Sequence, residues 1–507
     1  SDALVFLKHW KDSVRYQRAF GVLSDECAAV LAIEEDLQPR DYTMLRTVTT
    51  FELVDRKILS DLVREVAART VGGDEVARWV RNRRQSHWYA DYQHEYAALE
   101  EAAVFMDTLE QVDLSARAFM GRTVADVVAQ YAGTWYRLDQ GYRAFITHVR
   151  RSGQTTLFAD LAQRVENLYT NRYLLPLNNR WQAVIDTLEA WERQPGLSQA
   201  AFFERLVRPF LARGHKVFVV ISDGMRYEIG EELLRLIRQE DRYDATIEPA
   251  LTLLPSETQL CMAALLPHTR LTIADDGETV LVDGNSATGT ENRAKILAQA
   301  GGWRATALRA EDLLAMSREQ SRALFRDHDV VYVYHNRIDA TGDKRDSEER
   351  VFDAAAAALE ELVRIVKKLT SANVTNMLLT ADHGFIYQHQ PLDESDFAGQ
   401  EPTGTEIIKR HRRFVLGRGL QGAGGATSSF KHFTAAEVGL DGEMEMLIPK
   451  SINRLRIKGA GSRYVHGGAA LQEVVIPVIK VNKKRESDVR QVNVDILRGA
   501  GGATIST

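Results

Sequence analysis

The first 205 residues repeat apolar positions with the period of an α-helix. Apolar side chains three or four positions apart fall on one face of a helix, which can then pack against a core. Two stretches show this spacing: Leu53, Ile58, Leu59, Leu62 and Val66 in one, and Leu157, Leu161, Val165 and Leu168 in the other. Prolines are scarce in this part of the chain, so few positions would interrupt a helix. The pattern predicts an all-helical domain over residues 1–205.

Beyond residue 205 the pattern changes to short apolar runs rich in β-branched residues. These runs cover residues 216–221, 330–334, 375–380 and 474–478, and helical stretches such as residues 351–369 separate the first three. Strands that alternate with helices predict an α/β fold with a parallel sheet flanked by helices. Residues 391–462 interrupt this rhythm with Gly, Ser and basic residues and are expected to form a cap or insertion. The core would then comprise residues 206–390 and residues 463–507, the latter with the last strand and a C-terminal tail.

The composition narrows the class of protein. Of the 507 residues, 45% are apolar and 26% are charged, which is typical of a globular protein with sizeable cores. The net charge of −6 provides no overall attraction to nucleic acid or to a membrane surface. The two cysteines, Cys27 and Cys261, cannot build a disulfide framework and fit a reducing compartment. Because no apolar run approaches the ~20 residues that span a bilayer, we expect a cytoplasmic protein with no membrane contact.

Side chains that bind metal ions follow the ends of the predicted strands. Asp223 follows the first run, His335, Asp339 and Asp343 follow the second, Asp382 and His383 follow the third, and His466 precedes the last. Ligands of an open α/β sheet bind beyond the carboxyl ends of its strands. A single aspartate there could simply cap the next helix, but acids and imidazoles after three strands indicate a shared metal site. Zinc, manganese and similar divalent ions accept these ligands.

Thr258 is the candidate nucleophile. It stands in Pro255-Ser256-Glu257-Thr258, directly before the helix-forming stretch that starts at Cys261. Free backbone N–H groups at a helix N-terminus favour an anion such as phosphate. The alternative is that Ser256 and Thr258 only cap this helix, which is a common use of both residue types.

Four motifs in this order resemble the alkaline phosphatase superfamily, and within it the PglZ family of bacteriophage-exclusion (BREX) defence systems. They are Asp223-Gly224-Met225-Arg226, Pro255-Ser256-Glu257-Thr258, Ala381-Asp382-His383-Gly384, and His466-Gly467-Gly468 with Glu473. The resembling motifs lie within residues 216–480, whereas the helical first part is similar to PglZ proteins only through residues 86–89. The resemblance implies an alkaline-phosphatase-like sheet with an all-helical N-terminal domain and a cap insertion.

The resemblance also implies two divalent metal ions, with zinc expected first and manganese or magnesium as alternatives. One site would use Asp223, Thr258, Asp382 and His383, and the other would use Asp339, Asp343 and His466. Nucleotide pyrophosphatases of the superfamily have histidine where this chain has Asp343, so His335 is a spare candidate ligand or else a hydrogen-bonded core histidine. Arg226 is expected to contact a phosphate oxygen, with a surface ion pair as the alternative.

This resemblance implies a metal-dependent phosphoesterase, most simply a phosphodiesterase or nuclease, that acts in phage defence. The alternative is a catalytically weak or inactive scaffold that binds other BREX proteins such as the methyltransferase. The basic run Lys409-Arg410-His411-Arg412-Arg413 in the expected cap would suit a DNA or RNA substrate. A solvated loop is the alternative interpretation of that run.

Overall fold

The computed structural model describes residues 5, 9–11, 13, 15–191, 194, 196–421, 428–458 and 461–484. Residues 422–427 of the predicted cap and residues 485–507 of the predicted tail lie outside this description. Within the described residues, no helix combines the length and the apolar character that crossing a membrane requires.

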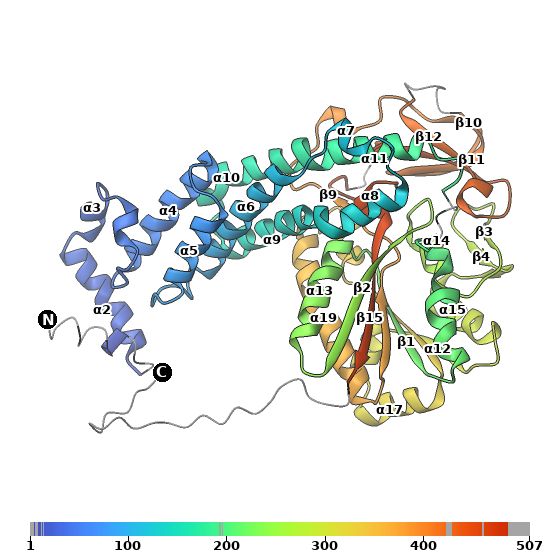
Figure 1. Ribbon diagram of the computed structural model, residues 1–507, viewed down its shortest axis with the longest axis horizontal. Coiled ribbons are helices and arrows are strands. Elements are labelled where there is room, and N and C mark those ends of the chain that lie inside the picture. The colour runs from blue at the N-terminus through green and yellow to red at the C-terminus, as the bar shows by residue number, and fades with distance from the viewer. Residues whose placement is uncertain are drawn as a thin grey trace.

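The N-terminal part is an elongated bundle of helices, coloured blue to blue-green in Figure 1. Its helices are α2 (Gln17–Val30), α3 (Ile33–Leu37), α4 (Glu52–Ala68), α5 (Gly73–Arg83), α6 (Gln93–Gln111), α7 (Ala116–Phe119), α8 (Val124–Gln130), α9 (Tyr136–Ser152), α10 (Thr155–Leu168) and α11 (Leu175–Asp186). Each long helix buries one apolar stripe, as the spacing predicts; α4, for example, buries Ile58, Leu59, Leu62 and Val66. Two π-helical turns, Tyr131–Trp135 and Tyr169–Leu174, interrupt the regular winding next to α9 and α11.

A six-stranded sheet forms the centre of the second part, in the order β2-β15-β8-β1-β7-β6. The strands are β1 (Val217–Ser222), β2 (Tyr243–Leu251), β6 (Ala305–Arg309), β7 (Val330–His335), β8 (Asn376–Thr380) and β15 (Val475–Lys483). Strand β1 pairs in parallel with β7 and with β8, and all six of its residues are buried. These central strands coincide with the predicted apolar runs. Strand β15 runs antiparallel to both neighbours, so the sheet is mixed rather than wholly parallel.

Helices cover both faces of this sheet: in Figure 1, α13 and α19 lie on one side, and α12, α14 and α15 lie on the other. They are α12 (Arg208–Ala212), α13 (Tyr227–Gln239), α14 (Thr258–Ala264), α15 (Gly289–Gln299), α16 (Ala310–Ala315), α17 (Arg318–Asp327), α18 (Asp339–Gly342), α19 (Val351–Ser371) and α20 (Leu471–Val474). Helix α9 of the N-terminal bundle packs against α13 and α19, which joins the bundle to the α/β part.

The smaller sheets lie in the connections that follow the central strands. Within residues 391–462, a four-stranded antiparallel sheet has the order β10-β11-β13-β12. Its strands are β10 (Thr403–His411), β11 (Phe414–Gln421), β12 (Phe430–Thr434) and β13 (Glu445–Pro449). A three-stranded sheet contains β3 (Leu271–Ile273), β4 (Val280–Val282) and β5 (Asn285–Ser286), and a two-stranded one pairs β9 (Ile386–Tyr387) with β14 (Tyr464–Val465).

Candidate metal and phosphoester site

Four segments that are distant in sequence bring the candidate ligands together. Asp223 directly follows β1, Asp382 and His383 follow β8, and Asp339 begins α18 a few residues after β7. These positions meet because β1 lies between β7 and β8 in the same sheet and all three strands run in parallel. His466 arrives from elsewhere: it follows β14, and the pairing of β14 with β9 holds it beside the loop after β8.

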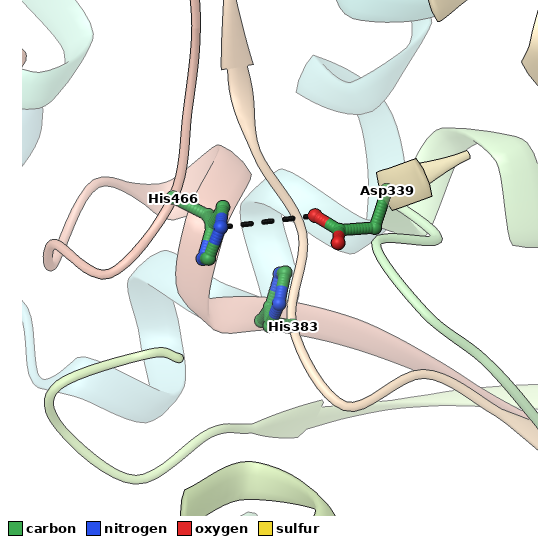
Figure 2. Close-up of side chains that lie close together, drawn as sticks. All are labelled: Asp339, His383 and His466. Atoms are coloured by element: carbon green, nitrogen blue, oxygen red, sulfur yellow. Dashed lines mark ion pairs between the residues drawn. The ribbon is translucent and has the colours of Figure 1, made fainter. Parts of the chain in front are cut away.

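Two groups of three side chains are arranged as metal ligands, and within each the ligand atoms lie within 4.8 Å of one another. The first group is Asp223, Asp382 and His383, with His383 Nε2 3.5 Å from Asp223 Oδ1 and 3.4 Å from Asp382 Oδ2. The second is Asp339, His383 and His466, with His466 Nε2 3.7 Å from Asp339 Oδ1 (Figure 2). The rings of His383 and His466 lie parallel, with centroids 4.2 Å apart. His383 therefore belongs to both groups.

Several candidate ligand atoms in these groups have no hydrogen-bond partner within the described part of the protein. Asp223 Oδ1, Asp382 Oδ2 and His466 Nδ1 are buried and make no hydrogen bond. Leaving such polar atoms buried and unpaired is costly, and two buried carboxylates side by side cost more because their charges repel. A bound divalent cation removes both penalties, and carboxylate oxygen with imidazole nitrogen is a donor set that zinc and manganese accept. The residues present therefore fit a metal ion.

The pKa values of the site follow from burial and from neighbouring charges. Burial raises the pKa of Asp223 well above its usual range, and the adjacent carboxylates of Asp382 and Asp339 raise it further. Burial also raises the pKa of Asp339 to about 6, although His383 opposes this. The pKa of His466 falls well below its usual range because of burial and the nearby His383. A neutral imidazole is the form that binds a metal ion.

Thr258 lies at the first residue of α14, and its Oγ1 is 3.0 Å from His383 Nε2. Neither candidate hydroxyl caps the helix, since the residue at the cap position is Glu257 and no side chain caps the helix there. Ser256 Oγ instead donates a hydrogen bond to the carbonyl oxygen of Gly468, 2.6 Å away. The hydroxyl of Thr258 thus faces the ligand groups.

Two positions beside these ligands require glycine, one because of close backbone contact and one because of its φ angle. A Cβ atom on Gly384, the residue after His383, would collide with the carbonyl oxygen of Gln472. Gly467, the residue after His466, has φ +104°, a conformation that strongly favours glycine. Both glycines therefore allow the ligand-bearing loops to approach closely.

Besides Thr258, three predicted site residues lie outside both ligand groups. Arg226 is fully buried and its Nη2 lies 2.8 Å from Asp139 Oδ1 of α9, so its predicted contact with a phosphate oxygen has no support in the geometry. Asp343 pairs with the buried Arg412 of the cap, and about half of the Asp343 side chain stays exposed. His335 uses both ring nitrogens in hydrogen-bond contacts, with Ser222 Oγ at 2.9 Å and Glu361 Oε2 at 3.0 Å, as the core-histidine alternative describes.

The basic run of the cap does not form a free cationic surface, so its ion pairs give no support to the nucleic-acid contact, which stays a prediction. Lys409 Nζ lies 2.9 Å from Glu278, Arg410 pairs with Glu401, and Arg412 pairs with Asp343. Arg413 is fully buried in an ion pair with Glu473 at 2.6 Å. The run folds back because β10 and β11 form a hairpin around residues 412 and 413 whose side chains turn onto the loops of the site.

A cleft of about 1500 Å³ opens beside Asp223 and Thr258. Two nearly buried side chains, Arg293 and Tyr334, line this cleft, and the sequence does not single out either of them. The guanidinium of Arg293 lies 4.8 Å from the ring centroid of Tyr334, and its Nε donates to the carbonyl oxygen of Ala287 at 2.9 Å. Because Arg293 sits within an ordinary amphipathic helix, no motif marks it.

The sequence model of a protein family, described as "BREX system PglZ alkaline phosphatase-like domain", matches residues 202–481, which is more than half of the chain. The chain belongs to the PglZ family. The alkaline-phosphatase-like fold that the four motifs imply is thereby confirmed, and PglZ membership agrees with the segment over which those motifs are spread.

Two curated relatives extend the similarity to nearly the whole chain. The alkaline phosphatase-like protein BrxZ of Escherichia coli O9:H4 (strain HS) is 33% identical over 494 residues, covering 95% of this chain and 56% of BrxZ. The alkaline phosphatase-like protein PglZ of Bacillus cereus (strain H3081.97) is 31% identical over 502 residues, covering 98% of this chain and 58% of that protein. The chain thus spans little more than half the length of these relatives.

Solved structures with related folds are distant. Murine ectonucleotide pyrophosphatase/phosphodiesterase 5 is 12% identical with a TM-score of 0.35, covering 53% of this chain and 88% of the murine chain. Phosphonoacetate hydrolase from Sinorhizobium meliloti 1021 is 13% identical with a TM-score of 0.34, covering 52% and 89% of the two chains.

Proposed function

We propose that this PglZ-family chain is a metal-dependent phosphoesterase that cleaves phosphodiesters in BREX phage defence. The observation that carries the proposal is the position of Thr258, whose Oγ1 lies 3.0 Å from His383 Nε2, the histidine shared by both ligand groups. A purely structural role for this hydroxyl would not require it to face the buried ligand atoms of both groups.

The ligand groups suggest where two divalent ions would bind. Asp223, Asp382 and His383 would hold one ion, and Asp339 with His466 would hold the other, with His383 able to contact either. Zinc fits this nitrogen and oxygen set, and manganese or magnesium would suit its acidic side. Bound there, the ions would neutralise charge on the phosphoryl group and lower the pKa of a nearby hydroxyl.

The residues of this chain then have separate roles. Thr258 Oγ1 forms a bond to phosphorus while the bond from phosphorus to the leaving alcohol breaks; the hydroxyl proton ends on that alcohol, and Thr258 is left esterified to the remaining phosphate monoester. Water hydrolyses this ester in a second step and restores the hydroxyl. Arg293 lines the same cleft, and its guanidinium binds the non-bridging oxygens of the phosphate. The sequence suggested this role for Arg226.

Metal analysis combined with turnover tests the proposal. The chain purified with zinc, manganese or magnesium is assayed on a chromogenic phosphodiester and a chromogenic phosphomonoester. Thr258→Ala should keep its metal content and lose diester hydrolysis by on the order of 10³-fold or more, whereas Thr258→Ser should retain measurable turnover. Activity of Thr258→Ala within tenfold of the unmodified chain would exclude Thr258 as nucleophile. The scaffold alternative, binding of other BREX proteins such as the methyltransferase without catalysis, requires that no metal supports turnover.

A further inference from the structure

Cations without partners line the cleft beside the site. Arg309, at the end of β6, and three residues of the segment after α18, namely Lys344, Arg345 and Arg350, line it and make no ion pair within the described residues. This differs from the cap run, whose cations are all paired. It also differs from Arg337 in the same lining, which lies 3.5 Å from Glu361.

The acidic side chains of the cleft do not balance these cations. Asp353 is paired with Arg150 of α9 at 3.2 Å, and Glu361 is occupied by His335 and Arg337. Glu311 and Asp346 remain without a cationic partner in the described residues. Counting Asp223 as well, three acids stand against the four unpaired cations and Arg293, so the cleft carries an excess of positive charge.

Two nearly buried polar side chains of the cleft, Tyr334 and Arg293, are available to contact a ligand. Tyr334 is 8% exposed and its hydroxyl is buried without a hydrogen bond, and Arg293 beside it is 6% exposed. A buried hydroxyl without a partner is unfavourable unless a ligand atom completes it. Both residues line the same cleft as Asp223 and Thr258, so an anionic ligand that reaches the floor also reaches the proposed nucleophile.

The size and shape of the site indicate the kind of anion. A volume of about 1500 Å³ exceeds the ~300–1,000 Å³ of a typical small-molecule pocket, so the cleft has room for a ligand larger than one nucleotide. Asp223 and His383 are almost completely buried, so the reacting phosphate must enter the cleft rather than touch its rim. A flexible single strand can do this, whereas the phosphates of a duplex remain on a wide, stiff cylinder.

Building on the proposed phosphodiesterase function, we propose that the cleft binds single-stranded nucleic acid. One phosphodiester lies at Thr258 and Arg293, and neighbouring phosphates contact Arg309, Lys344, Arg345 and Arg350. Tyr334 and the buried His335 are the only aromatic residues in the described lining, so binding depends on phosphate charge more than on base stacking.

The test compares two matched double variants, both made in a Thr258→Ala background so that the strand is not cut. Arg345→Gln/Arg350→Gln removes two cleft cations. Arg318→Gln/Arg322→Gln removes two exposed arginines of α17 that do not line the cleft. Binding of a labelled 12-nucleotide single strand and of its duplex is measured by fluorescence anisotropy over a range of salt concentrations.

Loss of two phosphate contacts should reduce the salt slope of single-strand binding by about 1.4, which corresponds to about 25-fold weaker binding near 0.1 M salt. The control pair should retain the slope of its parent. With Thr258 restored, the cleft variant should also show at least a tenfold lower ratio of oligonucleotide to small-diester kcat/KM. Equal slopes for the two double variants, or tighter binding of the duplex than of the single strand, would overturn the inference. A chain that turns over no phosphoester yet shows the predicted slope change would refute the proposed function and leave the binding site intact.

Discussion

The buried ion pair between the helical bundle and the site offers a quantitative prediction. Asp139 of α9 lies 2.8 Å from the guanidinium of Arg226, which comes three residues after Asp223. The same carboxylate accepts hydrogen bonds from four side chains: Tyr131 at 2.8 Å, Tyr169 at 2.7 Å, Tyr173 at 3.0 Å and Gln472 at 3.2 Å. Asp139→Asn preserves the shape of this centre and removes its charge.

The expected loss in the free energy of unfolding follows from the charge that stays buried after the substitution. Breaking a buried pair by removing one charge costs about 3–5 kcal/mol, because the other charge is left buried. Glu228 Oε1 lies 3.7 Å from Arg226 Nε and compensates part of that charge, so the lower end of the range, about 3 kcal/mol, is expected. The asparagine also replaces one acceptor oxygen by a donor that faces tyrosine hydroxyls. The urea slope of a chain this long is at least roughly 3 kcal/mol/M, the upper end of the range for small proteins, so the unfolding midpoint should fall by up to about 1 M.

Urea unfolding followed by tryptophan fluorescence measures this shift. Asp160→Asn is the matched control, because it makes the same chemical change at an exposed position of α10 and should leave the midpoint unchanged. The double variant Asp139→Asn/Arg226→Met should recover part of the loss, since it removes the uncompensated cation. A midpoint for Asp139→Asn within about 0.2 M of the control would refute the view that this pair stabilises the junction.

Three further predictions concern pH and metal. Burial raises the pKa of Glu101 to about 7 from the ordinary value of 4.5. The folded state therefore holds this proton more tightly than the unfolded state, and the free energy of unfolding should fall by about 2–3 kcal/mol as pH rises from about 4.5 through 7. Glu101→Gln should remove that part of the decline in urea midpoints measured across this range. Removal of metal with a chelator should lower the thermal midpoint, and restoring the ion at 100 times its Kd should return about 2.7 kcal/mol of stability; a midpoint indifferent to chelator would argue against a resident ion. His466→Gln should lose one equivalent of bound metal by elemental analysis while His335→Gln keeps its metal, and equal losses would show that the ligand groups are wrongly assigned.

The central strands could be predicted from sequence because burial on both faces leaves a continuous apolar signal. Residues 217–222 and 330–335 are entirely buried, and their β-branched runs show it. The edge strands could not be predicted in this way. Strand β2 mixes buried and exposed residues and contains Pro249, and β6 is only partly buried, so neither forms an apolar run. The direction of β15 depends on the path of the chain through residues 391–462, which local patterning does not encode.

In the site, too, positions set by the local sequence could be predicted, whereas contacts between distant segments could not. Asp223, Asp382 and His383 are brought together by parallel strands, and strand ends are visible in the sequence. Arg226 also follows a strand, but its partner Asp139 lies in a separate helical element, and only the packing of α9 on α13 decides where its guanidinium points. The cations of the cap run were likewise assigned without their acidic partners, which lie between 9 and 131 residues away along the chain.

The contacts of α20 argue that the helical bundle is part of the site rather than an appended module. Residues 468–473, between His466 and β15, are held from the bundle side by Trp181 Nε1, which donates to the carbonyl oxygen of Ala469 at 2.7 Å, and by Asn178 Oδ1, which accepts from Leu471 N at 3.0 Å. From the other side, the carbonyl oxygen of Glu473 accepts a hydrogen bond from Gly384 N at 2.8 Å, next to His383.

One short segment is therefore fixed at the same time by α11 and by the loop that bears the shared histidine. Since ligand loops in a metal site must be held to within a fraction of an ångström, deleting the bundle should disorder His466 and His383 even though no bundle residue belongs to either ligand group. Similarity to the curated relatives likewise extends through the helical part, beyond the segment that the family model matches.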